Sequence, residues 1–411
     1  MSTITAQAYA YKGRDTSGKV IKGRMEASSE SAVVSRMRSM GLSPVEIRPT
    51  SAGAGLNMEI NLGAFEKGVK LKDIAIMSRQ LATMIAAGLS LLRALSILAS
   101  QTENKTLGST LDSVRVAVEG GAALSDALAR HRQIFPPIMI HMVRAGETGG
   151  FLDHALESVA DTFEADVKLR STIKSALTYP VVVLIMAIVS VIGMLLFIVP
   201  IFEKMFADLG GELPLPTQIL VILSRAMVWI APVLLVGGIA FAIWWKRNKH
   251  TDAVRSRVDP LKLRLPVFGD LFRKVAIARF TRNFATMTGS GVPVLQSLAI
   301  VGETSGNWVI EKALINVQDS VRAGRIIAEP LANEPMIPSM VTQMIAVGED
   351  SGSLEQMLNK ISDFYDSEVQ ATTEALTSLI EPLMIAVIGT VIGGMIIALY
   401  MPIFTIFDQI H

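Results

Sequence analysis

The sequence predicts an all-α membrane protein, with two homologous cytoplasmic helical-bundle lobes, three transmembrane helices and a small N-terminal α/β domain. Three observations support this fold class. A set of motifs occurs twice at a constant long spacing, three long apolar runs carry no charge, and each copy of the repeat holds apolar residues at helical spacing. Composition agrees, because half of the 411 residues are apolar and only 18% are charged.

The two halves of the chain are related by an internal duplication. Matching motifs are 202 to 203 residues apart: Ser78–Met84 recurs as Thr281–Met287, Gly146–Gly150 as Gly348–Gly352, and Pro200–Phe202 as Pro402–Phe404. A repeat of this length indicates two homologous modules and not a solenoid of short units. Each module is predicted to end in a membrane span.

The chain begins with a predicted small cytoplasmic α/β domain at residues 1–48. Its expected elements are strands at Gln7–Lys12 and Val20–Ala27, a helix that begins after Ser28 or Ser29 and ends near Gly41, and a strand at Leu42–Ile47. Residues 49–69 begin with a stretch rich in Ala, Gly, Ser and Asn, which is typical of a flexible linker.

Two helical lobes are predicted, lobe 1 at residues 70–174 and lobe 2 at residues 260–376. Each contains the same apolar stripe, formed by Leu152, Leu156, Val159, Phe163 and Val167 in lobe 1 and by Leu354, Leu358, Ile361, Tyr365 and Val369 in lobe 2. These spacings place the side chains on one face of a helix. No proline follows either stripe before Pro180 and Pro382, so each helix is expected to run close to, or into, the next membrane span.

Three spans follow from runs without charge at residues 175–202, 226–245 and 382–407. Each run reaches the roughly 20 residues that cross a bilayer as a helix, which favours spans over buried core helices. The predicted segments are transmembrane helices at 175–202, 218–245 and 377–407, an external loop at 203–217, a basic linker at 246–259 and an external tail at 408–411.

The flanking charges predict the orientation of the spans. Lys and Arg gather before the first span and after the second, at residues 168–174 and 246–257, whereas the connection between these two spans is largely acidic. By the positive-inside rule, the N-terminus and both lobes are expected to be cytoplasmic, and residues 203–217 and the C-terminus lie on the far side.

Several function classes are excluded or disfavoured. The chain has no cysteine, its only Gly-Lys pair does not belong to a phosphate-binding loop, and its five histidines lack zinc-ligand spacing. A net charge of +1 gives no nucleic-acid footprint. The charge-free runs contain none of the ionisable groups that transporters and pumps use. We therefore expect no catalytic residues, no cofactor and no metal site, and a transporter or membrane-bound enzyme is the disfavoured third hypothesis.

The sharpest polar feature is the Gly-Glu-x-x-Gly turn, present in both copies. Its candidate residues are Gly146, Glu147 and Gly149 in the first copy and Gly348, Glu349 and Gly352 in the second. One hypothesis is that the two glutamates form a docking or cation site. The alternative is structural: glycine ends one helix, and the glutamate lies near the positive end of the long helix that follows.

A second repeated feature is an arginine followed nine residues later by glycine. Arg79 precedes Gly88, and Arg282 precedes Gly291. Two alternatives stay open, an ion pair inside each lobe or a contact with a partner protein.

The spans carry the remaining candidate positions. These are Tyr179 and Pro180 at the start of the first, Pro200 at its end, Pro382 and Pro402 in the third, and the pair Gly389 and Gly393. A Gly-x-x-x-Gly pair permits close packing against another helix.

Together these motifs resemble the inner-membrane platform protein of type IV pilus assembly and type II secretion systems. The likeness rests on the Ser/Thr-Arg-x-x-Ala-Thr-Met motif of each lobe, the Gly-Glu-x-x-Gly turns, and spans that open with Tyr-Pro or Glu-Pro and end with Pro-x-Phe. It covers about residues 70–407, and the N-terminal unit with Gly18, Gly23 and Ala27 fits too. The stretch Arg79–Asn104 is closer to the pilus-assembly members.

The resemblance implies a scaffold without catalytic activity that couples a cytoplasmic ATPase to polymerisation of pilins into a type IV pilus. The partners it implies are a hexameric assembly ATPase, pilin transmembrane helices, other inner-membrane pilus-assembly proteins, further copies of the chain and the lipid bilayer, with no nucleic acid. The alternative is the equivalent platform of a type II protein secretion system.

Overall fold

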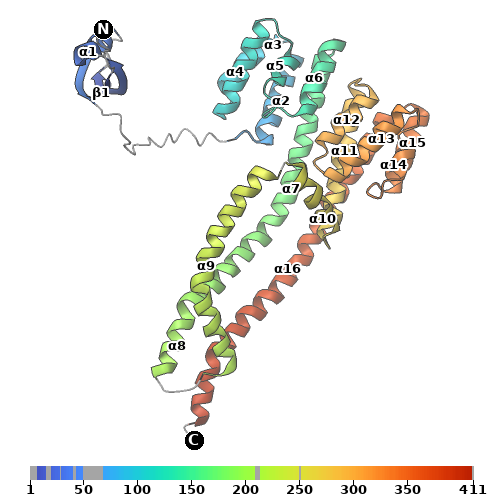
Figure 1. The fold of residues 1–411 in the computed structure, drawn as a ribbon. Coiled ribbons are helices and arrows are strands. Elements are labelled where there is room, and N and C mark those ends of the chain that lie inside the picture. The colour runs from blue at the N-terminus through green and yellow to red at the C-terminus, as the bar shows by residue number, and fades with distance from the viewer. Residues whose placement is uncertain are drawn as a thin grey trace. The chain divides into compact units, whose positions relative to one another are not determined.

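The computed structural model describes residues 7–14, 20–27, 29–39, 43–49, 68–208, 213–249 and 251–409. The chain divides into two compact units, Met1–Glu66 and Lys67–His411 (Figure 1). Most of the expected linker at 49–69 lies outside the described residues.

The first unit is a three-stranded antiparallel sheet covered by one helix. Its elements are β1 (Gln7–Arg14), β2 (Val20–Ala27), α1 (Glu30–Ser39) and β3 (Ser43–Pro49), with strand order β2-β1-β3. Tyr9 and Ala27 of the sheet pack with Val33 and Met37 of the helix in a small core. Residues 15–19, between β1 and β2, lie outside the described residues.

Lobe 1 is built from six helices, the last of which continues beyond the lobe. They are α2 (Leu71–Ala86), α3 (Leu91–Gln101), α4 (Lys105–Glu119), α5 (Leu124–Ala129), α6 (Pro137–Gly149) and α7 (Leu152–Gly193). The side chain of Asn104 caps α4 by accepting hydrogen bonds from the backbone N–H groups of Thr106 and Leu107.

Lobe 2 repeats this order after one additional helix. It contains α10 (Asp252–Arg264), α11 (Phe268–Gly289), α12 (Val294–Thr304), α13 (Trp308–Arg322), α14 (Ala328–Ala332), α15 (Ser339–Ser351) and α16 (Leu354–Gln409). Asn307 stands where lobe 1 has Asn104 and caps α13 in the same way. The duplication therefore repeats local structure as well as sequence.

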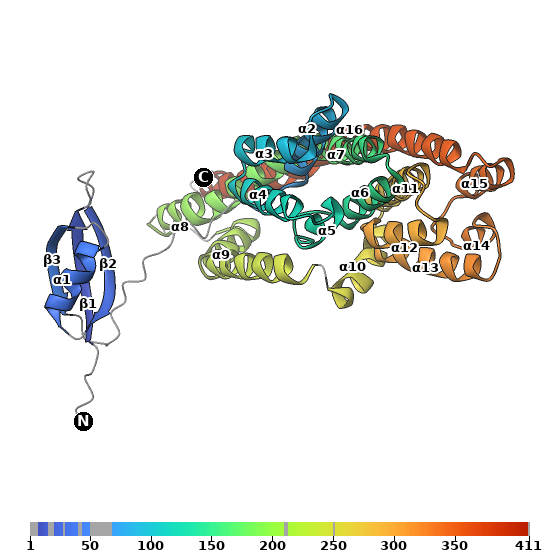
Figure 2. The ribbon, with the colours of Figure 1, turned by 90° about the horizontal axis from the view of Figure 1, so that it is seen from above.

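Both predicted stripes form the buried faces of long helices. Leu156 and Val159 on α7, and Leu358 and Ile361 on α16, are fully buried. They belong to one hydrophobic core that contains residues of both lobes, and Figure 2 shows α12 of lobe 2 beside α6 of lobe 1. The two lobes are thus joined by a shared core.

Three helices are long and apolar enough to cross a membrane, by length and composition: Leu152–Asp208, Leu215–Asn248 and Leu354–Phe404. The first consists of α7, a π-helical turn at Met194–Ile198 and α8 (Val199–Asp208); the second is α9 (Leu215–Asn248). As expected, the stripe helices run into their spans, with Pro180 and Pro382 inside α7 and α16.

The helices extend further than expected into three of the predicted connections. The expected external loop at 203–217 is helical up to Asp208 and again from Leu215, the expected basic linker at 246–259 is largely helix, and the expected tail at 408–411 is helical to Gln409. The prediction ended each span at its first charged residue. Charge marks the edge of the hydrocarbon and not the end of the helix, which continues while its backbone hydrogen bonds are formed.

Candidate functional site

The two glutamates of the Gly-Glu turns cap short helices in their own lobes. Glu147 of α6 accepts hydrogen bonds from the backbone N–H groups of Leu124 at 2.5 Å and Ser125 at 2.9 Å. Glu349 of α15 accepts them from Ile327 at 2.6 Å and Ala328 at 2.8 Å. The first N–H groups of a helix have no partner inside the helix, and a carboxylate satisfies them and favours the positive helix end.

This geometry corrects the structural hypothesis for the glutamates. They were expected at the positive end of the long helices α7 and α16, and they lie instead at the start of α5 and α14. The physical reason is that each glutamate is in the last turn of its helix, and its side chain faces the preceding short helix. Among the described residues, no group of three or more His, Asp or Glu lies close enough to hold a metal ion.

The glycines of the same turns permit a tight helical hairpin. A Cβ atom on Gly146 would lie 2.5 Å from Cβ of Ala155, and one on Gly348 would lie 2.9 Å from Cα of Leu354. Gly352 has a φ of +68°, in the left-handed region that ends a helix and favours glycine. On Gly149, an added Cβ would lie 2.0 Å from the ring of Phe151.

The glycines after the arginine motif close α2 and α11. Gly88 has a φ of +83° and Gly291 a φ of +71°. The next residues, Leu89 and Val292, donate backbone hydrogen bonds to Met84 and Met287, which is the usual glycine-dependent end of a helix. These glycines set the turn between the first two helices of each lobe.

Arg79 forms an ion pair inside lobe 1. Its guanidinium donates to Glu164 of α7 at 2.8 and 2.7 Å and also contacts Asp161. The hydrogen bond that Arg79 donates to Glu164 has the larger effect and the one to Asp161 the next, and both raise the pKa of Arg79. The same bond lowers the pKa of Glu164.

Arg282 forms the matching ion pair inside lobe 2, with Asp366 of α16. Asp366 occupies the position that Glu164 has in lobe 1, so the duplication preserves the pair. The surroundings differ: the Arg79 side chain is 34% exposed and the Arg282 side chain 10%. The intralobe ion pair is thus present in both lobes.

A third ion pair joins the lobes and was missed from the sequence. Asp166 of α7 contacts Arg279 of α11 at 2.7 Å, and both side chains are largely buried. Burial lowers the pKa of Arg279, while Asp166 acts in the opposite direction. The only sequence signal is that lobe 1 has Ile76 where lobe 2 has Arg279, a difference between the copies that does not identify a partner.

The spans are joined by hydroxyl groups at the two repeated prolines. Proline has no N–H, so Pro200 leaves the carbonyl of Leu195 without its donor in the π-helical turn, and Pro402 does the same for Ala398 in α16. The side chain of Ser224 donates to the Leu195 carbonyl at 2.5 Å. Thr217 donates to that of Ala398 at 2.5 Å.

Because Ser224 and Thr217 both belong to α9, this helix connects the two repeats where α7 and α16 end. A backbone carbonyl inside a bilayer requires a donor from the protein, which gives these hydroxyls a structural role. A small apolar cluster surrounds them, including Leu195, Val199 and Leu399.

The remaining span candidates lie on open surfaces or inside helices. Gly389 and Gly393 have no atom within 4 Å of an added Cβ, so this pair packs against nothing within the described chain. Tyr179 is exposed, and Pro180 beside it is buried. The glycine pair is therefore available to a helix from another molecule.

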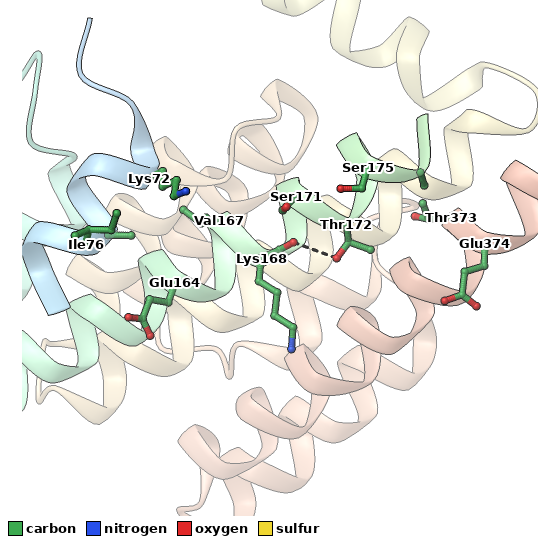
Figure 3. A pocket seen from close by; sticks show the side chains of 12 residues that line it. Lys72, Ile76, Glu164, Val167, Lys168, Ser171, Thr172, Ser175, Thr373 and Glu374 are labelled. Atoms are coloured by element: carbon green, nitrogen blue, oxygen red, sulfur yellow. Dashed lines mark hydrogen bonds between the residues drawn. The ribbon is translucent and has the colours of Figure 1, made fainter. Parts of the chain in front are cut away.

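A cavity of about 670 Å³ lies where lobe 1 meets its span (Figure 3). Lys72 and Ile76 of α2, and Lys168, Ser171 and Ser175 of α7, line it together with residues of α16. Most of the lining is apolar or hydroxyl-bearing, and its two lysines are balanced by Glu164 and Glu374.

Comparison with known proteins identifies matches to both repeats. A family model described as type II secretion system (T2SS), protein F, matches residues 77–200 and again 280–402, and the model of that protein's N-terminal domain matches residues 3–48. The double match coincides with the duplication seen in the sequence.

Individual relatives match over nearly the whole chain. The type IV pilus assembly protein PilC of Myxococcus xanthus is 43% identical, covering 99% of this chain and 96% of the relative. PilC of Thermus thermophilus is 41% identical, over 97% and 98%. A type II secretion system protein F of Pseudomonas aeruginosa is 33% identical, over 97% and 98%.

Proposed function

Since this chain belongs to the family of type II secretion system protein F, we propose that it is the inner-membrane platform of a type IV pilus assembly machine. Two PilC relatives exceed 40% identity over almost the full chain, which supports the pilus branch of the family. The family membership agrees with the resemblance predicted from the sequence.

The observation that carries the mechanism is the continuity of α7 and α16. Each helix begins in the core of a lobe and runs into a membrane span. A force on either lobe would therefore move a span directly. In the proposed mechanism, a hexameric cytoplasmic ATPase displaces the lobes, and the spans transmit this displacement to pilins in the membrane.

The proposed pilin contact is the open face of the third span. Gly389 and Gly393 leave room for close approach of an apolar helix. The orientation proposed for the chain places the N-terminus and both lobes in the cytoplasm and the α8–α9 connection on the far side. An epitope near the C-terminus that a protease reaches from the cytoplasmic side would contradict this topology.

The first test is a clean deletion strain in which pilin and ATPase levels are verified. Loss of surface filaments with pilin retained in the membrane is the expected result. Normal filaments would overturn the proposal. Crosslinks between the lobes and the ATPase should form in piliated cells, and their absence there would contradict the coupling step.

The alternative is the platform of a type II secretion system, and the relative from Pseudomonas aeruginosa favours it. Normal filaments with secreted proteins trapped inside the deletion strain would support this alternative. Genes for an outer-membrane secretion set beside this one would point the same way, whereas a major pilin and a retraction ATPase would favour the pilus.

For the two glutamates, we propose a structural role and test it against a docking role. Glu147→Ala should lower stability and protein level, because two backbone N–H groups of α5 lose their acceptor. Loss of filaments at a normal protein level would instead favour docking.

A further inference from the structure

The two lobes contact one another through different surfaces. Lobe 1 contributes α6 and α7, whereas lobe 2 contributes α11, α12 and one face of α16. Asp166 of α7 contacts Arg279 of α11 at 2.7 Å, and the hydroxyl groups of Thr162 and Thr286 are 3.1 Å apart. Because the lobes are homologous, this is a head-to-tail contact.

A head-to-tail contact between two homologous lobes leaves one copy of each surface unused. The repeat offset places Ile76 and Thr83 of lobe 1 where lobe 2 has Arg279 and Thr286. It places Phe364 and Glu368 of lobe 2 where lobe 1 has Thr162 and Asp166. Ile76 and Phe364 are both 48% exposed, large apolar side chains on these unused surfaces.

The unused surface of lobe 1 is hollow where its counterpart in lobe 2 is filled. The groove of lobe 2 between α11 and α16 is filled by two residues from α7 of lobe 1. These are Leu169 and Ile173, which pack against Leu271, Val275 and Val369. The equivalent groove of lobe 1, between α2 and α7 and bordered at one end by Thr373 and Glu374 of α16, is the cavity of about 670 Å³ in Figure 3. The positions correspond directly: Lys72 matches Val275, and Val167 matches Val369.

The unused surface of lobe 2 carries suitable residues on α16. Ala371 and Ala375 stand where lobe 1 has Leu169 and Ile173, and both are exposed. The groove carries no net charge, because Lys72 and Lys168 are balanced by Glu164 and Glu374, so its apolar and hydroxyl-bearing lining favours the contact. The face of α16 carries Asp363 and Glu368, with Lys360 as its one opposing charge in this stretch.

We propose that the groove of lobe 1 binds lobe 2 of a second copy of this chain, through the face of α16 that contains Phe364. The contact repeats between chains the arrangement that joins the lobes within one chain. Since such contacts are head-to-tail, they generate a ring if the rotation closes and a row if it does not. The contact forms in the membrane whether the platform serves a pilus or secretion.

The chain contains no cysteine, which makes disulfide crosslinking in membranes a direct test. Two differently tagged copies, Thr83→Cys and Phe364→Cys, are expressed together and oxidised. A disulfide-linked heterodimer is expected, because the equivalent pair Thr162 and Thr286 is within 3.1 Å in the chain. The positive control is the double variant T162C/T286C within one chain. Its two cysteines should form a disulfide, which is measured as their protection from a thiol-labelling reagent.

The matched negative control pairs Phe364→Cys with Val116→Cys on α4, which is 54% exposed and outside both surfaces. If T83C with F364C gives no more heterodimer than V116C with F364C while T162C/T286C is protected, the proposal is wrong. The filament assay tests the proposed function and is independent of the crosslinking test. A strain that forms the crosslink but no filaments would support the contact between copies and contradict only the pilus function.

A charge test separates this contact from general apolar adhesion. In the T83C copy, Ile76→Arg should retain the heterodimer, because Glu368 of the second copy stands opposite as Asp166 does to Arg279. Glu368 also pairs with Lys274 of its own lobe at 2.9 Å, just as Asp166 also pairs with Arg170 at 3.2 Å. Ile76→Glu should reduce it at least fivefold by placing like charges together. Equal crosslinking of the two variants would overturn the proposed register. The exposure of Ile76 makes both substitutions compatible with folding.

Discussion

Lobe 1 and lobe 2 share one helical order, one capping asparagine and one arginine ion pair, yet they bury different faces. Lobe 2 buries the side of α11 that carries Arg279 and Arg282 against α7. The equivalent side of α2 in lobe 1, with Ile76 and Arg79, stays open. The difference shows that duplication copies the fold of a lobe, while the neighbour decides what each position contributes to stability.

The largest expected effect tests this comparison at the two arginines. Arg282→Ala removes a buried guanidinium and leaves the partly exposed Asp366 without its partner, which should cost about 2 to 3 kcal/mol. Arg79→Ala removes a more exposed pair and should cost about 1 kcal/mol or less. Thermal unfolding of the purified protein in detergent measures both. Equal losses would show that the neighbouring lobe does not set the difference.

The hairpin glycines give the next effect. Gly146→Ala places a methyl group 2.5 Å from Cβ of Ala155, and Gly348→Ala places one 2.9 Å from Cα of Leu354. Each should cost about 2 kcal/mol through overpacking, with the larger loss in lobe 1. Gly237→Ala in α9, where the added Cβ has no atom within 4 Å, is the control and should not lower the unfolding midpoint.

The hydroxyls of α9 compare the two repeats inside the membrane. Ser224→Ala and Thr217→Val remove the donors to the carbonyls of Leu195 and Ala398. Each should cost about 1 kcal/mol, the range found for hydrogen bonds between membrane helices. Ser190→Ala, on an exposed face of α7, serves as the matched control. A midpoint that is as insensitive to Ser224→Ala as to this control would contradict the structural role of the hydroxyl.

The smallest effect is the pH dependence of the Arg79 pair. The pKa of Glu164 is lower in the folded protein than its ordinary 4.5, because Arg79 binds the carboxylate. The stabilisation is therefore present above pH 4.5 and is lost as the pH falls through the lowered value. Comparing Glu164→Gln with the unmodified chain should show a gap in unfolding free energy of a few tenths of a kcal/mol at pH 7 that closes as the pH falls below 4.5. A constant gap would contradict this assignment.

The sequence alone determined the duplication, the three apolar helices and the buried stripes, because each depends on a pattern within a short stretch of chain. Apolar spacing around Leu156 or Leu358 fixes which side of a helix leaves water, whatever it then packs against. Helix ends were predicted less well, as at 203–217, because charge and backbone hydrogen bonding do not change at the same residue.

Only the tertiary structure decided what the repeated polar residues do. Glu147 caps a helix more than 20 residues before it, Asp166 pairs with Arg279 across the lobe boundary, and Ser224 serves a carbonyl that Pro200 leaves without a donor. Each partner lies far along the chain, and its identity follows from packing. A local pattern can show that a buried charge or carbonyl needs a partner, but only the folded arrangement of helices provides one.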